Sequence, residues 1–322
     1  METTTFVASV LGLVSFFGVA FNWTVVIANR QIPSSKHSFG ILTAYQAFGD
    51  AIHSTIFFFF VCPTIYLNNE FLMNHLHYAG YWLMFGYELS TQSHLLISFN
   101  RFCAVFYPTK YFTIFSIRNT HRVATVLILF SLTYTFANYF MGCTLNWYKE
   151  VFLFNFPPIE FCLIFVFYTD FCKFLFTILL VVIIDVLTVF RVHQLRKKVL
   201  WLKKIFVSGS FCFQIRGTTA SADARAAAQR SREMSFLKQT CAQGSIFTCE
   251  LITYFILSPM IKNQWLLFLS TSFAWVSVHA LDGFVTLMFN QDMRKFIKKS
   301  ILRKPIPHDL ASKISSTRTQ LN

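Results

Sequence analysis

The ionisable side chains that interrupt apolar sequence are the residues of this chain best suited to chemistry. Asp50, Glu88, Glu250 and Asp282 each stand within a long apolar run, and Arg101 stands near the end of one. Charged groups are costly in a bilayer, where they mark ion pairs, ligand sites or sites for protons and cations. No phosphate-binding loop, HExxH motif or Ser/His/Asp spacing accompanies them in the sequence. We therefore expect binding and switching, with no enzyme activity, no metal site and no cofactor.

A second set of polar residues is expected at the depth of a small-molecule site. By the rise of an α-helix, Glu88 lies about 20 Å along the helix axis from Arg101, and Gln92 shares its face one turn later. Asp170 and Lys173 are spaced so that they could simply neutralise each other. The expected pocket adds four aromatic residues: Phe85, Tyr254, Phe268 and Trp275. The alternative is that each aromatic residue only packs or belongs to an interfacial belt.

Seven apolar runs must position these residues. Of the 322 residues, 55% are hydrophobic, with 41 Phe, and only 13% are charged, which would leave a soluble protein with too little polar surface. A helix of about 20 apolar residues spans the hydrocarbon core of a bilayer. The runs cover residues 6–28, 39–61, 78–102, 123–145, 165–190, 241–261 and 265–289. We expect an all-α integral membrane protein, a seven-transmembrane helix bundle within residues 1–302.

The distribution of Lys and Arg predicts an N-terminus outside the cell. In that orientation all but three of the 28 Lys and Arg flank the cytoplasmic ends of the runs, the exceptions being Lys149, Lys173 and Lys262. The formal charge of +14 would then meet anionic membrane lipid and acidic partner surfaces, and nucleic acid is not implied. The first run lacks a preceding basic segment and a cleavage site, so we expect a span and not a signal peptide.

The eight cysteines show no CxxC or Cys/His metal spacing. Cys62, Cys143 and Cys162 stand at the outer ends of runs, in an oxidising compartment for the expected orientation. A bridge between Cys143 and Cys162 would staple the second outer loop. The alternative is that both remain free thiols.

The third cytoplasmic loop, residues 191–238, is the longest polar insertion. Its part 220–233 is rich in helix-forming residues and is expected to extend the sixth span. Residues 199–217 contain an unusually apolar stretch, which is either a segment on the membrane surface or sequence foreign to the mature protein, such as a translated intron. The triplet 208–210, Ser-Gly-Ser, would break an amphipathic helix and favours the second interpretation.

Two elements follow the last span. Residues 290–302 place Met293, Phe296 and Ile297 at helical spacing among basic residues. This pattern predicts a short amphipathic juxtamembrane helix on the inner leaflet. Residues 303–322 read as a disordered cytoplasmic tail.

The inner end of the third run carries a recognisable motif. Asn100-Arg101-Phe102, followed by Val105 and Pro108, resembles the Asp-Arg-Tyr-x-x-Val-x-x-Pro signature of rhodopsin-like G-protein-coupled receptors. Further landmarks of that family are Gly18, Asn22, Asp50, Asp282, Gly283 and Asn290. Residues 100–105 with Pro108, residues 111–116, residues 275–283 and residues 289–290 are similar to the nematode serpentine chemoreceptors of the Srx class. The resemblance covers all seven runs.

The resemblance implies a role for the residues of this motif. It makes Arg101, with its neighbours Asn100 and Phe102, the switch that couples to a G protein; an interfacial Arg that only snorkels is the alternative. Because Asn100 replaces the usual acid, we hypothesise that Asp185 supplies the resting-state ion pair of Arg101. The sixth run has no Cys-Trp-x-Pro and the fifth has no central Pro, so the family's switch details cannot be transferred.

The family packing would also bring Asp50 and Asp282 together near Asn22. Two close carboxylates in a low dielectric cannot both stay ionised unaided, so a shared proton, a cation or His279 is expected between them. We hypothesise a proton or sodium site that biases the switch. Polar adhesion between helices is the alternative.

These features together predict a multi-pass receptor of the plasma membrane. The resemblance implies that it binds a small extracellular molecule, an odorant or pheromone, and activates a heterotrimeric G protein. The alternative is a seven-span transporter or ligand-gated channel whose permeation path is lined by Asp50, Glu88, Glu250 and Asp282. Against it, the sequence shows neither an inverted repeat nor a pair of broken half-helices.

Overall fold

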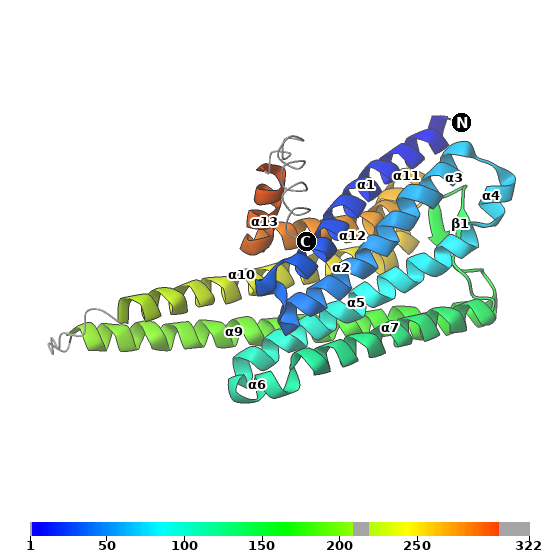
Figure 1. Cartoon of the computed structure of the whole chain (residues 1–322). Coiled ribbons are helices and arrows are strands. Elements are labelled where there is room, and N and C mark those ends of the chain that lie inside the picture. The colour runs from blue at the N-terminus through cyan, green and yellow to red at the C-terminus, as the bar shows by residue number, and fades with distance from the viewer. Residues whose placement is uncertain (1, 209–218, 303–322) are drawn as a thin grey trace, which may run out of the picture.

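Seven long helices form the body of the molecule (Figure 1). The computed structural model describes residues 2–208 and 219–302. The long helices are α1 Glu2–Gln31, α2 Ser38–Ile56, α5 Leu76–Phe106, α7 Ile117–Phe140, α9 Lys173–Ser208, α10 Thr219–Leu251 and α12 Ala274–Phe289. Over the described ranges, six helical segments are long and apolar enough to cross a membrane. The seventh, α5, packs against α2, α7, α9 and α10, and the expected all-α seven-helix class is confirmed.

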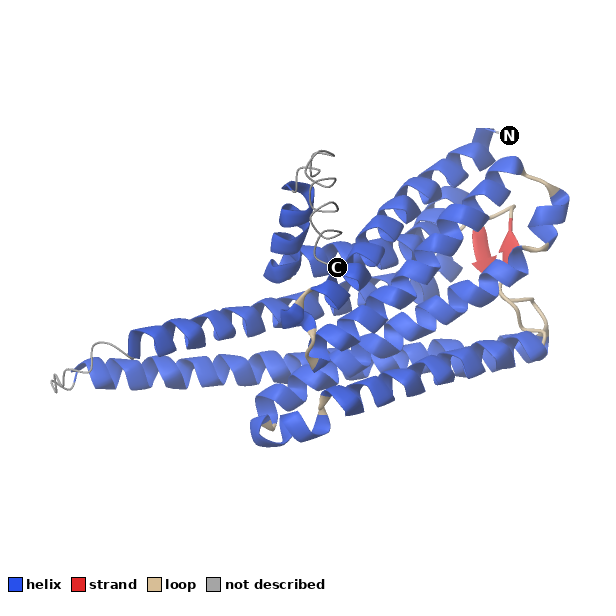
Figure 2. Ribbon diagram, in the orientation of Figure 1, coloured by secondary structure: helices blue, strands red, loops and turns tan. Residues whose placement is uncertain are grey.

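Short elements extend or connect the long helices (Figure 2). The short helices are α3 Cys62–Leu67, α4 Glu70–Asn74, α6 Pro108–Ile114, α8 Glu160–Val166, α11 Gln264–Phe268 and α13 Gln291–Leu302. Two strands, β1 Asn146–Tyr148 and β2 Leu153–Asn155, pair antiparallel with Trp147 opposite Phe154. This hairpin lies at the end of the bundle that also holds the N-terminus.

Four of the spans contain a π-helical stretch. These stretches are Phe57–Val61 after α2, Phe167–Cys172 before α9, Ile252–Leu257 after α10 and Leu269–Phe273 before α12. Such stretches bend helices and are frequent at functional sites. They provide a source of curvature in the fifth and sixth spans that does not depend on a central proline.

Close helix packing depends on glycine at the contact between α2 and α5. A Cβ atom on Gly49 would lie 2.8 Å from the backbone oxygen of Gly86, and one on Gly86 would lie 2.8 Å from the backbone oxygen of Gly49. Small residues at such crossings let two backbones approach within a membrane. The arrangement holds the middle of α2 against α5, where Gln46, Asp50 and His94 are buried.

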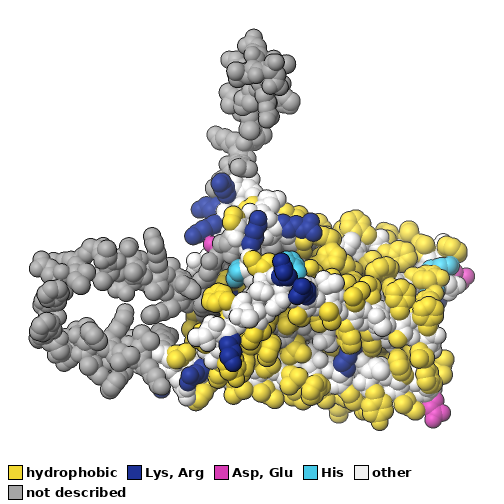
Figure 3. Space-filling view, turned by 60° about the horizontal axis from the view of Figure 1, so that its bottom comes forward, with side chains coloured by type: hydrophobic (Ala, Val, Ile, Leu, Met, Phe, Trp, Pro, Cys, Tyr) yellow, Lys and Arg dark blue, Asp and Glu magenta, His cyan; other side chains and the backbone are white. Residues whose placement is uncertain are grey.

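The outer surface matches a bilayer. Large apolar side chains such as Phe59, Phe140 and Phe176 are 66%, 79% and 64% exposed. Such exposure is unfavourable in water, but it is expected for side chains that contact lipid. Figure 3 shows hydrophobic side chains over the body and Lys and Arg gathered toward one end. Helix α13, with Lys295, Lys298 and Lys299 exposed, packs against the end of α1 near Arg30.

Three segments differ from their expected limits or lie outside the described residues. The fourth helix ends at Phe140, earlier than residue 145, because Gly142 turns the chain with φ +72°. Helix α9 continues to Ser208 and α10 begins at Thr219, so the sixth helix extends as expected beyond its membrane span. Residues 209–218, which include the end of the questioned stretch 199–217, and the expected tail 303–322 lie outside the described residues.

Candidate functional site

A disulfide and a hairpin cover the outer end of the bundle. Cys143 and Cys162 are joined, with Cα atoms 5.3 Å apart, so the pairing considered from sequence is present. Between them, the hairpin inserts Phe154, which is 2% exposed and lies edge-on to the rings of Phe57 and Trp275. Ser272 donates to the backbone oxygen of Phe152 at 2.8 Å. The second outer loop is therefore packed into the bundle.

A small cavity lies beneath this cover. Its volume is about 30 Å³, the space of one or two water molecules. The lining residues come from five different segments of the chain: Met84, Tyr87, Leu145, Phe156, Asp170, Glu250, Tyr254, Phe255 and Trp275. Any organic ligand that uses this site must enlarge it.

Two acidic side chains reach the cavity, each with a tyrosine partner. Tyr87 donates to Glu250 Oε2 at 3.1 Å, and Tyr134 donates to Asp170 Oδ1 at 3.2 Å. Both carboxyl groups are buried. No basic residue is among the described residues that line the cavity.

Lys173, the lysine near the cavity, forms an ion pair with Glu88. Lys173 Nζ lies 2.5 Å from Glu88 Oε2 and 3.4 Å from the centre of the Tyr134 ring. Gln92 donates to the other oxygen of Glu88 at 3.1 Å. Glu88 is thus neutralised by Lys173. The spacing of Asp170 and Lys173 allowed an ion pair between them, but the partner of Asp170 is Tyr134.

The structure divides the expected pocket residues into three groups. Asp170, Tyr254 and Trp275 line the cavity. Glu88, Gln92 and Lys173 form the neighbouring charged network. Phe85 packs against Trp82, and Phe268 packs against Phe152 and Trp265. Neither lines the cavity, so for both residues the alternative of a packing role applies.

A buried polar cluster occupies the middle of the bundle and contains two histidine and aspartate pairs. His279 Nδ1 lies 2.7 Å from Asp50 Oδ1, and His94 Nε2 lies 2.8 Å from Asp282 Oδ2. Gln46 donates to Asp282 Oδ2 at 2.9 Å. All five side chains are at most 2% exposed. Each carboxylate therefore has its own histidine, whereas we expected one group shared between the two acids.

Asn22 joins α1 to this cluster. Its side-chain amide donates to the backbone oxygen of His279 at 2.8 Å. A Cβ atom on Gly283 would lie 2.5 Å from Asn22 Oδ1, so only glycine leaves room for this contact. Asn22, Asp50 and His279 are thus brought together, with Asp282 one helical turn further along α12.

Several polar atoms of the cluster lack a hydrogen-bond partner among the described residues. They are Asn22 Oδ1, Gln46 Oε1, Asp50 Oδ2, His279 Nε2, Asp282 Oδ1 and both ring nitrogens of His53. The His53 ring lies 3.8 Å from that of His279, centre to centre. Buried polar atoms are almost always satisfied. The proton or sodium site hypothesised from the sequence and the alternative of polar adhesion are both compatible with these contacts.

Gln46, His53 and His94 were missed as members of the cluster. The sequence contained a usable signal for His94, which shares a helix face with Arg101 and Tyr87 at intervals of seven residues. Gln46 and His53 share the face of Asp50 at four and three residues. Polar residues at such spacing around an intramembrane acid could have been grouped with it.

An aromatic clamp holds Arg101 at the opposite end of the bundle from the hairpin. The guanidinium carbon lies 3.7 Å from the centre of the Phe39 ring on α2 and 4.9 Å from that of Phe236 on α10. The two rings are 4.4 Å apart, and Arg101 is 4% exposed. The clamp therefore ties α2, α5 and α10 together.

The neighbours of Arg101 also fix this end of α5. Asn100 Nδ2 donates to Ser38 Oγ at 3.1 Å, and Tyr111 Oη lies 2.7 Å from the same Ser38 oxygen. Phe102 stacks on Phe106 at 4.3 Å. Asn100, in place of the usual acid, thus links α5 to α2 and α6.

The hypothesised ion pair between Arg101 and Asp185 is not formed. Both residues are described, and no ion pair joins them. Asp185 is 6% exposed, and its Oδ1 has no hydrogen-bond partner in the described part of the chain. The position of Asp185 was inferred from its depth in the fifth span, but depth does not set which way a side chain faces. The aromatic clamp takes the place expected for this pair.

The helix after the last span packs as an amphipathic element. Asn290 Oδ1 accepts from the backbone N–H of Asp292 and Met293, which caps α13. Met293 is fully buried with Val25 and Ile32 of the α1 end. Lys295, Lys298 and Lys299 are exposed.

Comparisons with known proteins agree with this geometry. The chain matches a protein family described as "Serpentine type 7TM GPCR chemoreceptor Srx" over residues 13–290. Serpentine receptor class X 45 of Caenorhabditis elegans is 28% identical over 319 residues, covering 94% of this chain and 82% of that protein. Serpentine receptor class X-43 of the same organism is 25% identical over 280 residues, covering 85% and 80%. Squid rhodopsin shares the fold with a TM-score of 0.72 at 14% identity, covering 93% of this chain and 85% of that one.

Proposed function

Because this chain belongs to the Srx family of serpentine seven-transmembrane chemoreceptors, we propose that it binds a small extracellular molecule and activates a heterotrimeric G protein. Its place is the plasma membrane of a sensory cell, with the N-terminus outside. The position of the exposed Lys and Arg at one end of the bundle supports this orientation (Figure 3).

The observation that carries the proposal is the clamp on Arg101. The guanidinium is buried between rings of α2 and α10, and outward movement of α10 would release it toward an intracellular partner. A ligand causes such a movement only if it binds the open state more tightly than the closed one. The small volume of the cavity supports this view, because a ligand must enlarge it.

The cavity favours a ligand that carries an amine. Asp170 and Glu250 bring two carboxyl groups to an otherwise apolar and aromatic site. Burying acidic groups without a cation is costly, and Lys173 is already paired with Glu88. A protonated amine would supply the missing charge, while Tyr254 and Trp275 would contact its apolar or aromatic part. We therefore propose an amine with a small hydrophobic body.

Glu250→Gln tests this ligand class. A hydrogen bond to a charged group is worth about 1.5–3 kcal/mol, so we expect the amine concentration for half-maximal response to rise about tenfold or more. The response is nucleotide exchange on a G protein in membranes that contain the receptor, over a panel of amines and of alcohols of the same shape.

Glu160→Gln is the matched control, because this glutamate is exposed at the start of α8. It should respond as the parent does. An equal response of parent and Glu250→Gln to the amines, or a preference of the parent for the alcohols, would rule out the amine assignment.

A further inference from the structure

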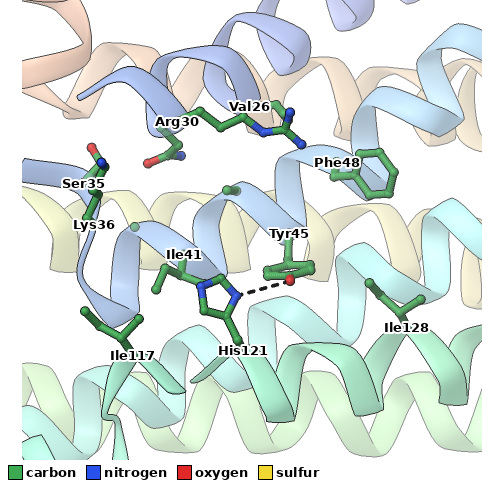
Figure 4. A pocket seen from close by; sticks show the side chains of 13 residues that line it. Val26, Arg30, Ser35, Lys36, Ile41, Tyr45, Phe48, Ile117, His121 and Ile128 are labelled. Atoms are coloured by element: carbon green, nitrogen blue, oxygen red, sulfur yellow. Dashed lines mark hydrogen bonds between the residues drawn. The ribbon is translucent and has the colours of Figure 1, made fainter. Parts of the chain in front are cut away.

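We propose that a groove between α1, α2 and α7 binds an anionic phospholipid of the inner leaflet. The groove has a volume of about 540 Å³ and lies outside the ligand cavity and the polar cluster. Figure 4 shows Arg30 at the end of α1, Lys36 in the connection between α1 and α2, and Ile117, His121 and Ile128 from α7 around one space. Lipid binding here is separate from ligand binding and coupling, and its assignment to the inner leaflet rests on the orientation proposed above.

The charge of the groove suits a phosphate group. Arg30 and Lys36 are both exposed, and neither forms an ion pair with a described residue. None of the described lining residues is acidic. Two unneutralised cations at the level of the inner headgroups attract anionic lipid.

A buried amide gives the groove a second, independent indication of a ligand. Asn29 lines it and is 7% exposed, yet neither its side-chain nitrogen nor its oxygen has a hydrogen-bond partner in the described ranges. Buried amides are almost always satisfied. A phosphate or ester oxygen would accept from its nitrogen, and a headgroup hydroxyl or ammonium would donate to its oxygen.

The remaining walls suit an acyl chain. Ile41, Ala44 and Phe48 of α2 and Ile128 of α7 line the groove. Tyr45 Oη lies 3.4 Å from His121 Nδ1, which links α2 to α7 on one wall. A polar end with two cations and an apolar continuation match a lipid, whereas a free phosphate would leave the apolar walls uncovered.

Native mass spectrometry of the full-length receptor tests the site. The receptor is taken from mixed micelles that hold equal amounts of phosphatidylserine and phosphatidylcholine with the same acyl chains. We expect the parent to retain phosphatidylserine preferentially. Each Lys or Arg near an anionic surface changes binding by about fivefold, so Arg30→Gln combined with Lys36→Gln should weaken retention by roughly 30-fold.

Two further variants make the result specific. Lys110→Gln with Lys238→Gln removes two exposed charges outside the groove and should retain phosphatidylserine as the parent does. Ala44→Trp keeps the charges but fills the groove, and should also lose the lipid. Equal retention of the two lipids by the parent, equal losses in both double variants, full retention by Ala44→Trp, or displacement by inorganic phosphate would each overturn the proposal.

Discussion

Replacing Asp282 by alanine is expected to destabilise the receptor by about 3 kcal/mol, because the change removes the partner of two buried groups. His94 and Gln46 both bond to Asp282 Oδ2, at 2.8 and 2.9 Å. Both would lose this acceptor in an apolar interior and would keep only the 3.2 Å contact between Gln46 Nε2 and His94 Nε2. The apparent unfolding midpoint in detergent should fall by roughly 5–10 °C. A thiol-reactive dye can report it, since Cys62 and Cys103 are free and buried until the protein unfolds.

A double-mutant cycle with His94→Ala separates this pair from general packing. Coupled residues show a clear interaction energy, and independent ones do not. Glu160→Ala, an exposed acid at the start of α8, serves as the control and should unfold like the parent. Additive losses for His94→Ala and Asp282→Ala would show that the pair does not act as a unit. Signalling that ignored both sodium and pH, with the fold intact, would assign the cluster to polar adhesion only.

Opening the aromatic clamp should raise signalling without a ligand. Phe236→Leu keeps an apolar side chain but removes the ring that contacts both Arg101 and Phe39. A desolvated contact between a cation and a ring is worth about 2 kcal/mol, so basal nucleotide exchange should rise by up to about 30-fold. The increase is expected because the contact stabilises the closed state alone.

Phe176→Leu is the control for this substitution. Phe176 is 64% exposed on α9 and faces the membrane, so its replacement should leave basal exchange unchanged. Basal exchange by Phe236→Leu equal to that of the parent, at equal surface expression, would mean that the clamp does not restrain α10.

The fold could be predicted from the sequence because apolar length is a sufficient signal for a membrane helix. The last span was expected at 265–289 and the helical segment covers Gln264–Phe289. The hairpin Asn146–Asn155 could not be found in this way, because two strands of three residues have no periodicity to detect. Burial of Leu145 and Phe154 depends instead on the loop folding inward beside the Cys143–Cys162 bridge.

The candidate site was only partly predictable, because residue type indicates a polar site but not its pairings. Asp50, Glu88 and Asp282 stood out as intramembrane acids, yet the basic partner of each comes from another helix. Those partners are set by helix rotation, which a single sequence does not contain. Asp185 shows the same limit: its depth was suited to Arg101, but its side chain does not meet it.

The role of Arg101 in coupling is tested most directly by comparing G-protein activation by the parent and by Arg101→Ala, both verified at the cell surface, over the panel of amines and alcohols. Nucleotide exchange and ligand binding are measured on the same membranes. We expect the parent to respond, and we expect Arg101→Ala still to bind ligand but no longer to evoke exchange, because the buried guanidinium is the group released to the partner. An equal response from both receptors would contradict the account, since Arg101 would then play no part in coupling.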